Sequence, residues 1–312
     1  MNRKVENFIR HSYYAKWLAT RFLQFACLFN PTFDVNRIFK RYFGRKMDLK
    51  NPGTLPEKIV WMELYSDTSM WTYCEDKYLM REYVERKGYG DNLPKLYAVW
   101  QKAKEIDMSV LPDKFVMKAN HGCGDVLVCK DKSKLNVAKI KKDFKRILSL
   151  PYGYNNAALH YTRIKPCIIA EELLVNDYAD ISASMVDFKV WCINGRAKSV
   201  LIVYDRDEKK HSVDLYDVNW NRLPQYLNRK NKNLFFDDNN KFKYKPLCLN
   251  WMLKIAEDLA EGFPEVRVDF YIVESKPIVG EMTFAAGYSS LTEEYYRLLA
   301  EDIKLEKFEV FK

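Results

Sequence analysis

The sequence predicts an α/β protein of the α+β type, with helices and two lobes that contain antiparallel strands. The chain of 312 residues is long enough for two domains of about 100–200 residues each. After residue 110, short alternating or β-branched segments joined by turn signals predict strand pairs. Hydrophobic residues make up 48% and charged residues 30%, which is typical of a globular chain and excludes disorder.

Helices are predicted mainly in the first part of the chain. Residues 1–50 have helical character with a break at Asn30-Pro31. Residues 76–87 predict a helix that ends at Gly88, because glycine readily adopts the left-handed conformation found after helix ends. Further helices are expected at 137–148 and 249–262.

The strand pairs follow from period-two alternation and turn chemistry. Asn194-Gly195 is a strong hairpin signal, because both residues tolerate the positive φ of a type I′ turn. The segment 219–245, rich in Asn, Lys and Asp, is expected to form a long exposed loop. The predicted strands are 114–119, 126–129, 167–170, 187–193, 197–204, 266–273 and 277–284.

The charge balance is basic: 51 Lys and Arg against 42 Asp and Glu give a net charge of +9. Such a surplus attracts phosphates, acidic glycans or anionic membranes, although the lysines are spread as on an ordinary solvated surface. No nucleic-acid-binding signature is present, so no nucleic-acid partner is expected.

The cysteine pattern predicts a reducing compartment and hence a cytoplasmic protein. The seven cysteines form no CxxC pair, and the four histidines form no HExxH motif, which argues against a disulfide framework or a zinc site. The apolar run 17–29 is broken by Arg21 and Gln24, and no signal-peptide cleavage site follows it. Helices packed on the core are one interpretation of this region; peripheral membrane association through a basic N-terminal helix, involving Arg10, is the other.

The loop His121-Gly122-Cys123-Gly124 has the composition of a phosphate-binding flap. Glycines let backbone N–H groups approach a ligand, and Lys118 ends the strand that enters the loop. The loop runs into a strand, unlike a Walker A loop, which opens a helix. An ordinary hairpin turn with a surface lysine is the alternative.

Two carboxylates are expected to face each other in the last hairpin. Arg267 and Asp269 share one face of a strand by period two, as do Glu281 and Thr283 on the returning strand. Facing carboxylates repel unless a cation lies between them, and Mg²⁺ prefers one or two such ligands. We expect Asp269 and Glu281 to be active-site groups rather than core residues; an ion-paired cluster is the alternative.

Glu171 and Glu172 end a predicted buried strand, where unpaired carboxylates are costly to bury. One interpretation is a hinge that receives an adenine through its backbone, with a carboxylate near the amine or ribose. The other is an ordinary strand end in solvent.

The order of these segments resembles the ATP-grasp superfamily, specifically its teichuronopeptide-biosynthesis-like (TupA-like) branch. Each motif alone is unspecific, whereas their order and spacing are specific, and the likeness runs from about residue 48 to 299. The motifs are NPGTLPEKIVWMELY, DKYLMREYV, FVMK, HGCG, IIAEELL, DFKVWCINGR, LYDVNWNRLP and RVDFYIVESKPIVGEMTF.

The resemblance implies an ATP-grasp fold, in which two α/β subdomains grip ATP between antiparallel sheets, behind a helical N-terminal extension. The implied regions are 1–60 for this extension, 61–110 for a helical linker with the Asp76-Lys77 motif, 111–175 for a small lobe with the glycine flap, and 176–312 for a large lobe with the magnesium site.

It also implies roles for individual residues. Lys77, Lys118 and the loop His121 to Gly124 would contact the ATP phosphates, and Arg267 would stabilise charge on the transferring groups. The other implied ATP-binding residues are Glu171, Glu172 and Leu174 at the adenine, Asp187 at the ribose, and Lys189 without a specified role. The implied magnesium ligands are Asp269, Glu281 and Thr283; many ATP-grasp enzymes have Asn in place of Thr283, so a second metal ion is in question.

The implied reaction is ATP-dependent joining of a carboxylate to an amine through an acyl phosphate, with ATP and Mg²⁺ as cofactors. The branch is associated with bacterial surface polysaccharides such as capsules, so a glycan or small molecule carrying carboxylate and amine groups is the expected partner, at the inner face of the membrane. The oligomeric state is not predicted. Two alternatives stay open: a glycosyltransferase using a metal at Asp205-Arg206-Asp207, and a non-catalytic nucleotide-binding assembly protein.

Overall fold

The structure, a computed structural model, describes residues 13–154, 157–207, 210–237 and 239–307. Its contacts divide the chain into two compact units. Unit 1 comprises the described residues up to Ile38, together with Asp76–Tyr78 and Lys95–Leu173. Unit 2 comprises Phe39–Glu75, Leu79–Pro94 and the described residues from Leu174 onward.

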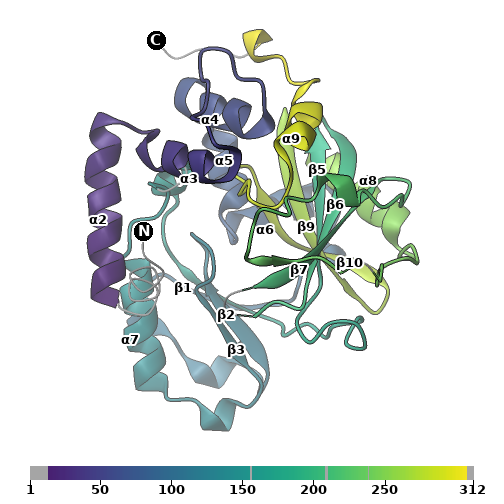
Figure 1. Cartoon of the computed structure of the whole chain (residues 1–312). Helices are drawn as coiled ribbons and strands as arrows, with labels where there is room; N and C mark the ends of the chain where they lie inside the picture. The colour runs from purple at the N-terminus through teal and green to yellow at the C-terminus, as the bar shows by residue number, and fades with distance from the viewer. Residues whose placement is uncertain (1–12, 155–156, 208–209, 238, 308–312) are drawn as a thin grey trace. The chain divides into compact units, whose positions relative to one another are not determined.

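Unit 1 is built on a four-stranded antiparallel sheet of order β1-β4-β2-β3 (Figure 1). Its strands are β1 (Leu96–Trp100), β2 (Phe115–Ala119), β3 (Val126–Cys129) and β4 (Ile168–Glu171). Helix α7 (Val137–Leu148) is capped by Asn136, whose side chain accepts a hydrogen bond from the Lys139 N–H. Its apolar face packs Ile140 and Phe144 into the buried core of this sheet.

Helix α2 (Tyr13–Phe29) also belongs to unit 1 and ends just before the predicted Asn30-Pro31 break. Polar side chains tie it to the rest of the unit: Tyr13 to Ser149 at 3.0 Å and Gln24 to Tyr154 at 3.2 Å. The predicted helical residues before Tyr13, Arg10 among them, lie outside the described residues. In the described part of the chain, no helix has the length and apolar character needed to cross a membrane.

Unit 2 is built on a six-stranded sheet of order β10-β9-β5-β6-β7-β8, in which only the β7–β8 pairing is parallel. Its strands are β5 (Asp187–Ile193), β6 (Arg196–Tyr204), β7 (His211–Asp217), β8 (Leu234–Phe235), β9 (Glu265–Val273) and β10 (Lys276–Thr283). Helix α8 (Leu249–Leu259) contacts β5, β6, β9 and β10 (Figure 1). These contacts bury one stripe of α8 and place a large core on that side of the sheet.

The remaining helices are short and come mostly from the first hundred residues. Helix α4 begins with a capping box, in which Thr54 and Glu57 satisfy each other's backbone N–H groups. Arg45 then bridges Glu57 and Glu293, which joins α4 to the helix that begins at Glu293 in the same unit. The α-helices are α3 (Phe33–Phe43, across the division of the units), α4 (Leu55–Tyr65), α5 (Ser69–Glu75), α6 (Leu79–Arg86) and α9 (Glu293–Ala300). The 3₁₀ turns are Gly90–Asn92, Ala103–Glu105, Met108–Val110, Lys132–Lys134, Leu159–Arg163, Pro224–Tyr226 and Leu305–Lys307.

The predicted fold class is confirmed: helices combine with two mainly antiparallel sheets, and the predicted strands are found within one residue at each end. The prediction of a long exposed loop over 219–245 was right only in part: most of the described segment is irregular, but several of its residues are buried. The segment contains the short strand β8, and it buries Trp220, Leu227, Leu234 and Phe242, which are separated by polar residues. The average composition of the segment is polar, so it did not indicate that these apolar residues are buried.

Candidate functional site

The glycine loop of unit 1 lies at the tip of the β2–β3 hairpin. Gly122 and Gly124 have φ of +99° and +85°, a left-handed conformation that other residues rarely adopt. The Lys77 ammonium donates a hydrogen bond to the Gly122 carbonyl at 2.8 Å, which anchors the loop. A side chain at Gly122 would also meet the Tyr152 ring, 3.0 Å from its Cβ position. Two of the predicted phosphate-contacting elements, Lys77 and the loop, are therefore brought together.

His121 and Cys123 of this loop have opposite environments. His121 is buried and its Nδ1 has no hydrogen-bond partner, whereas Cys123 is exposed. Burial lowers the pKa of His121 below its ordinary value, and the Leu150 backbone opposes the shift only in part. The imidazole is therefore neutral near neutral pH.

Lys118 and Glu171 form an ion pair in unit 1, with 2.6 Å between the ammonium and a carboxylate oxygen. Lys118 lies on β2 and pairs in register with Ile169 of β4, so Glu171 is its diagonal neighbour on the same face. Both side chains are mostly buried. The Lys118 charge is thus already balanced by the carboxylate that was predicted to face the adenine.

The other predicted adenine-binding residues follow β4. The Glu172 N–H donates to the Lys95 carbonyl at 2.9 Å, and its carboxylate accepts from the Lys95 N–H at 3.4 Å. Glu172 therefore extends the edge of the unit 1 sheet, whereas Leu174 already belongs to unit 2.

In unit 2, the predicted charged residues gather on one face of three neighbouring strands. Lys189 of β5 pairs in register with Asp269 of β9, and Asp269 pairs with Glu281 of β10. A bulge between Val279 and Glu281 makes the last pairing, because it inserts Gly280 and returns Glu281 to the face of Asp269. Glycine suits this position, since a Cβ there would lie 2.9 Å from the Tyr271 ring.

Asp269 is the centre of this cluster, which we call the β9 cluster: Asp187, Lys189, Arg267, Asp269, Glu281 and Thr283. The Arg267 guanidinium donates to both Asp269 carboxylate oxygens, at 2.6 and 2.8 Å, and the Lys189 ammonium donates to one of them. Asp269 is only 3% exposed. The expectation that Asp269 is not a core residue was therefore wrong. Asp269 is buried, because it accepts hydrogen bonds from two largely buried cations, Lys189 and Arg267.

Burial and charge act against each other in the β9 cluster. Burial raises the pKa of Asp269, and Arg267 and Lys189 oppose that shift. Burial alone would lower the pKa of Arg267, but Asp269 and Glu281 outweigh it and raise that pKa above its ordinary value. The Arg267 guanidinium also stacks over Trp191, 5.6 Å from the ring centroid, which fixes its position.

The oxygen ligands predicted for magnesium are adjacent, and their chemistry fits that ion. The Arg267 guanidinium lies 3.9 Å from a Glu281 oxygen and donates to the Thr283 hydroxyl at 3.3 Å. All three predicted ligands therefore lie next to this guanidinium. Among the described residues no group of three or more His, Cys, Asp or Glu is arranged to hold a metal. Two carboxylates suit Mg²⁺ that is further bound by phosphate oxygens and water.

The sequence interpretation missed two residues at the β9 cluster. Arg206 pairs with Asp187 at 2.5 Å, and so occupies the carboxylate that was assigned to the ribose. Tyr271 lies two residues beyond Asp269 on β9, and the neighbouring Asp187 charge raises its pKa well above the ordinary value. Tyr271 could have been identified from the sequence, because residues two apart on a strand lie on the same face. The contact of Arg206 depends instead on the path of the chain after β6.

The Asp205-Arg206-Asp207 triplet does not present two similar carboxylates. Asp205 pairs with Lys241 at 3.1 Å and accepts a hydrogen bond from the Ala183 N–H. Asp207 accepts a hydrogen bond from the Lys210 N–H at 2.6 Å. These contacts explain the acidic residues as structural groups of the loop after β6.

Solved structures with a similar arrangement are ligases and synthetases at low identity. The first is D-alanine–D-alanine ligase from Bacillus anthracis complexed with ATP: TM-score 0.45, 12% identity, 77% of this chain and 66% of that chain. The second is an ADP complex of PurK, N5-carboxyaminoimidazole ribonucleotide synthetase: TM-score 0.43, 12% identity, 72% and 48%. The third is the ATP-grasp ligase PsnB with a phosphomimetic variant of a minimal precursor, Mg and ADP: TM-score 0.39, 12% identity, 76% and 60%. The chain therefore spans 66% or less of each of these proteins.

The sequence itself matches a family model over most of its length. Comparison with curated proteins gives no match. The family model TupA-like ATPgrasp matches residues 57–304 and so includes both the glycine loop and the β9 cluster. This match confirms the predicted resemblance and the ATP-grasp fold. The chain belongs to the TupA-like ATP-grasp family.

Proposed function

We propose that this chain is an ATP-dependent carboxylate–amine ligase that works through an acyl phosphate. The observation that supports this most is the β9 cluster, in which Lys189, Arg267, Asp269 and Glu281 meet on neighbouring strands in a chain of the ATP-grasp family. Such a cluster places fixed charges of both signs, as catalysis of phosphoryl transfer requires.

Each unit contributes a distinct set of groups to ATP binding in this proposal. In unit 1, Lys77, Lys118 and the backbone of the loop around Gly122 and Cys123 bind phosphate oxygens. Glu171, Glu172 and Leu174 hold the adenine, and Asp187, with Lys189 beside it at 3.9 Å, holds the ribose side. Phosphate would replace Glu171 as the partner of Lys118, since the two anions compete for one ammonium.

Asp269, Glu281 and Thr283 would hold Mg²⁺, which supplies neutralising charge to the phosphate oxygens when bound. Arg267 is already oriented by Asp269 and Trp191, and so presents its guanidinium without reorganisation. A preoriented cation stabilises the charge that develops on the phosphoryl and acyl oxygens.

The proposed reaction has two steps. A carboxylate oxygen of the first substrate attacks the γ-phosphorus of ATP, the bond to the bridging oxygen breaks, and ADP leaves. The nitrogen of an amine then attacks the acyl carbon, inorganic phosphate leaves, and the amine gives up a proton to water. No covalent enzyme intermediate is needed.

For the substrates, we propose a uronic acid or amino sugar of a bacterial surface polysaccharide joined to an amino acid or other amine. The net charge of +9 suits an acidic glycan. We place the reaction in the cytoplasm at the inner face of the membrane, and the seven free cysteines suit a reducing compartment.

The proposal is tested by thermal unfolding with Mg²⁺ and ATP, a non-hydrolysable ATP analogue, GTP or UDP-sugars. We expect ATP and its analogue to raise the midpoint with Mg²⁺, because a ligand of the native state stabilises it by mass action. Glu281→Gln should lose most of this shift and of ADP formation with carboxylate and amine pairs, by about 100-fold or more.

Glu294→Gln is the matched control, because Glu294 is an exposed carboxylate on α9 of the same unit. It should behave like the parent. Stabilisation by a UDP-sugar alone would overturn the proposal in favour of a glycosyltransferase, and ATP binding without any turnover would favour an assembly protein.

A further inference from the structure

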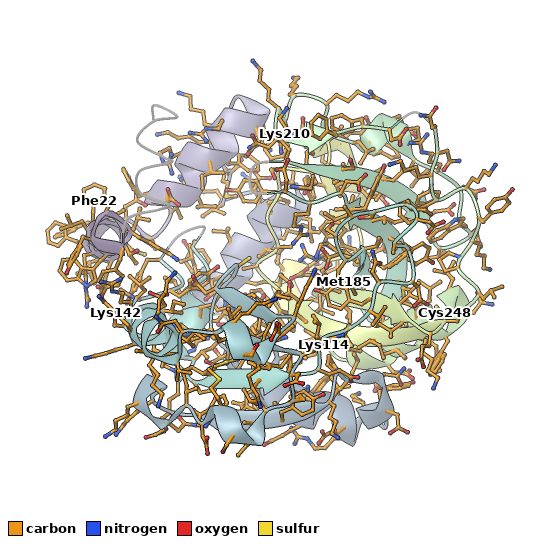
Figure 2. All side chains as sticks on the ribbon, turned by 90° about the horizontal axis from the view of Figure 1, so that it is seen from below. Phe22, Lys114, Lys142, Met185, Lys210 and Cys248 are labelled. Carbon is orange, nitrogen blue, oxygen red and sulfur yellow. The ribbon has the colours of Figure 1, made fainter. Side chains whose placement is uncertain are left out.

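Helix α2 turns its apolar side outward. Tyr14, Leu18, Phe22, Phe25 and Phe29 recur at spacings of three and four, so they lie on one face of the helix. Each is between 60% and 77% exposed, as is Leu28 beside them. Figure 2 looks nearly along this helix and shows Phe22 on the side away from the rest of unit 1. We call these six residues the outer face of α2.

The polar side of α2 contacts the rest of unit 1 instead. Lys16 forms an ion pair with Asp125 at 3.3 Å, next to the glycine loop. Tyr13 and Gln24 bond to Ser149 and Tyr154, as described above. A helix that covers a globular protein normally does the reverse, with its apolar stripe on the core and its charges in water. The position of α2 therefore leaves a contiguous apolar surface that water does not favour.

The charges around the outer face are mainly positive, although α7 also carries Asp143, which lies 3.9 Å from Arg146. α2 contains no Asp or Glu from Tyr13 to Phe29, and Arg21 is exposed among the apolar residues. Helix α7, which α2 contacts through Ser149 at its end, exposes Lys139, Lys142 and Lys145. Figure 2 labels Lys142 on the same side of unit 1 as Phe22.

We propose that the outer face of α2 docks on an anionic lipid surface, with α2 lying in the plane of the interface. Aromatic and aliphatic side chains would enter the acyl boundary, while Arg21 and the α7 lysines meet the headgroups. The described part of α2 has 17 residues, and no helix among the described residues is long and apolar enough to cross a bilayer.

A second copy of this chain fits the outer face less well. Two α2 helices packed on each other would bring Arg21 of both copies together, with no carboxylate on either helix to pair with them. An anionic lipid surface would instead attract the positive charge of Arg21. The docking is independent of the ATP reaction, because none of the outer-face residues belongs to the proposed active site.

The test is co-sedimentation of the full chain with vesicles of phosphatidylglycerol and phosphatidylcholine, compared with phosphatidylcholine alone. We expect binding to the anionic vesicles that weakens with salt. The triple variant Leu18→Ser/Phe22→Ser/Phe25→Ser should lose at least about tenfold in vesicle affinity, because each buried apolar side chain contributes to partitioning. Lys139→Gln/Lys142→Gln/Lys145→Gln should lose about tenfold as well, with binding that depends less on salt than that of the parent, because Arg21 remains.

Two variants and a stability measurement serve as controls. Tyr244→Ser/Leu247→Ser removes apolar side chains of unit 2 that are even more exposed, 78% and 95%, and this variant should bind vesicles like the parent. Thermal midpoints of all variants should match the parent, since none of these side chains is buried. Glu281→Gln should also bind vesicles normally, which separates a failure of docking from a failure of the proposed activity.

Three results would overturn the proposal: no sedimentation of the parent with anionic vesicles, equal binding to phosphatidylcholine alone, or unchanged binding of the Leu18/Phe22/Phe25 variant. A concentration-dependent dimer in analytical ultracentrifugation that this variant abolishes, without vesicle binding by the parent, would assign the outer face to a second copy.

Discussion

The two charged clusters hold their charges in different ways. In unit 1, Lys118 is paired with Glu171, next to a loop whose glycines have positive φ. In unit 2, Asp269 is shared by Lys189 and Arg267 within a buried sheet face. A single pair can exchange its anion for phosphate, whereas a shared carboxylate keeps several groups in place at once. We therefore expect substitutions in unit 2 to affect folding and turnover together, and those in unit 1 to affect mainly binding.

The largest effect is expected for Asp269→Asn. The change leaves Arg267 and Lys189 buried without the charge they share, and loss of one partner of a buried ion pair costs about 3–5 kcal/mol of unfolding free energy. Mg²⁺-dependent turnover should also be lost. Denaturant unfolding and ADP release measure the two effects.

Asp302→Asn is the control, since it breaks the exposed pair with Lys198 in the same unit and should leave the unfolding midpoint unchanged. An Asp269→Asn protein as stable as the parent would remove the contrast between the clusters.

A smaller effect on folding is expected for Lys118→Ala. ATP affinity should fall about tenfold or more, because a charge-assisted hydrogen bond contributes about 1.5–3 kcal/mol. Loss of the Lys118 charge beside Glu171 should also lower stability, and adding Glu171→Gln should restore part of the stability without restoring ATP binding. Isothermal titration and denaturant unfolding of the single and double variants check this. ATP affinity equal to the parent in Lys118→Ala would refute the flap assignment.

The smallest effect concerns His121 and appears only with pH. Its folded-state pKa lies below the ordinary 6.5, so the unfolded chain takes up a proton first as the pH falls. The contribution of His121 to stability is therefore complete above about pH 6.5 and declines below it. Unfolding free energies of the parent and His121→Gln at pH 7.5 and 5.5 isolate this contribution, because His211 titrates in both proteins. A parent and variant with the same pH dependence would mean that His121 titrates normally.

Local patterns predicted the strands and the main charged residues. The Asn194-Gly195 turn and the alternation along 266–273 are decided by neighbours in sequence, so the β5–β6 and β9–β10 hairpins could be foreseen. The same holds for the pairing of Asp269 with Glu281, although its register depends on the bulge at Gly280.

Features that depend on distant contacts could not be foreseen. Lys189, one partner of Asp269, lies 80 residues away in the sequence, and it reaches Asp269 because β5 pairs with β9. Which side of α2 faces unit 1 is likewise decided by Asp125, Ser149 and Tyr154, far along the chain. Helical periodicity identifies two faces of a helix, and only the tertiary contacts determine which one is outside.

The bridge of Arg45 to Glu57 and Glu293 has a consequence for synthesis on the ribosome. Arg45 and Glu293 are 248 residues apart, and α4 packs on α9 within the same unit. At about 5–20 residues per second, roughly 10–50 s pass between the emergence of the two ends. During that time α4, whose Leu55, Ile59 and Met62 are buried in the finished protein, lacks its contact with α9. We therefore expect chaperones to bind the first helices of unit 2 while the rest of the chain is synthesised.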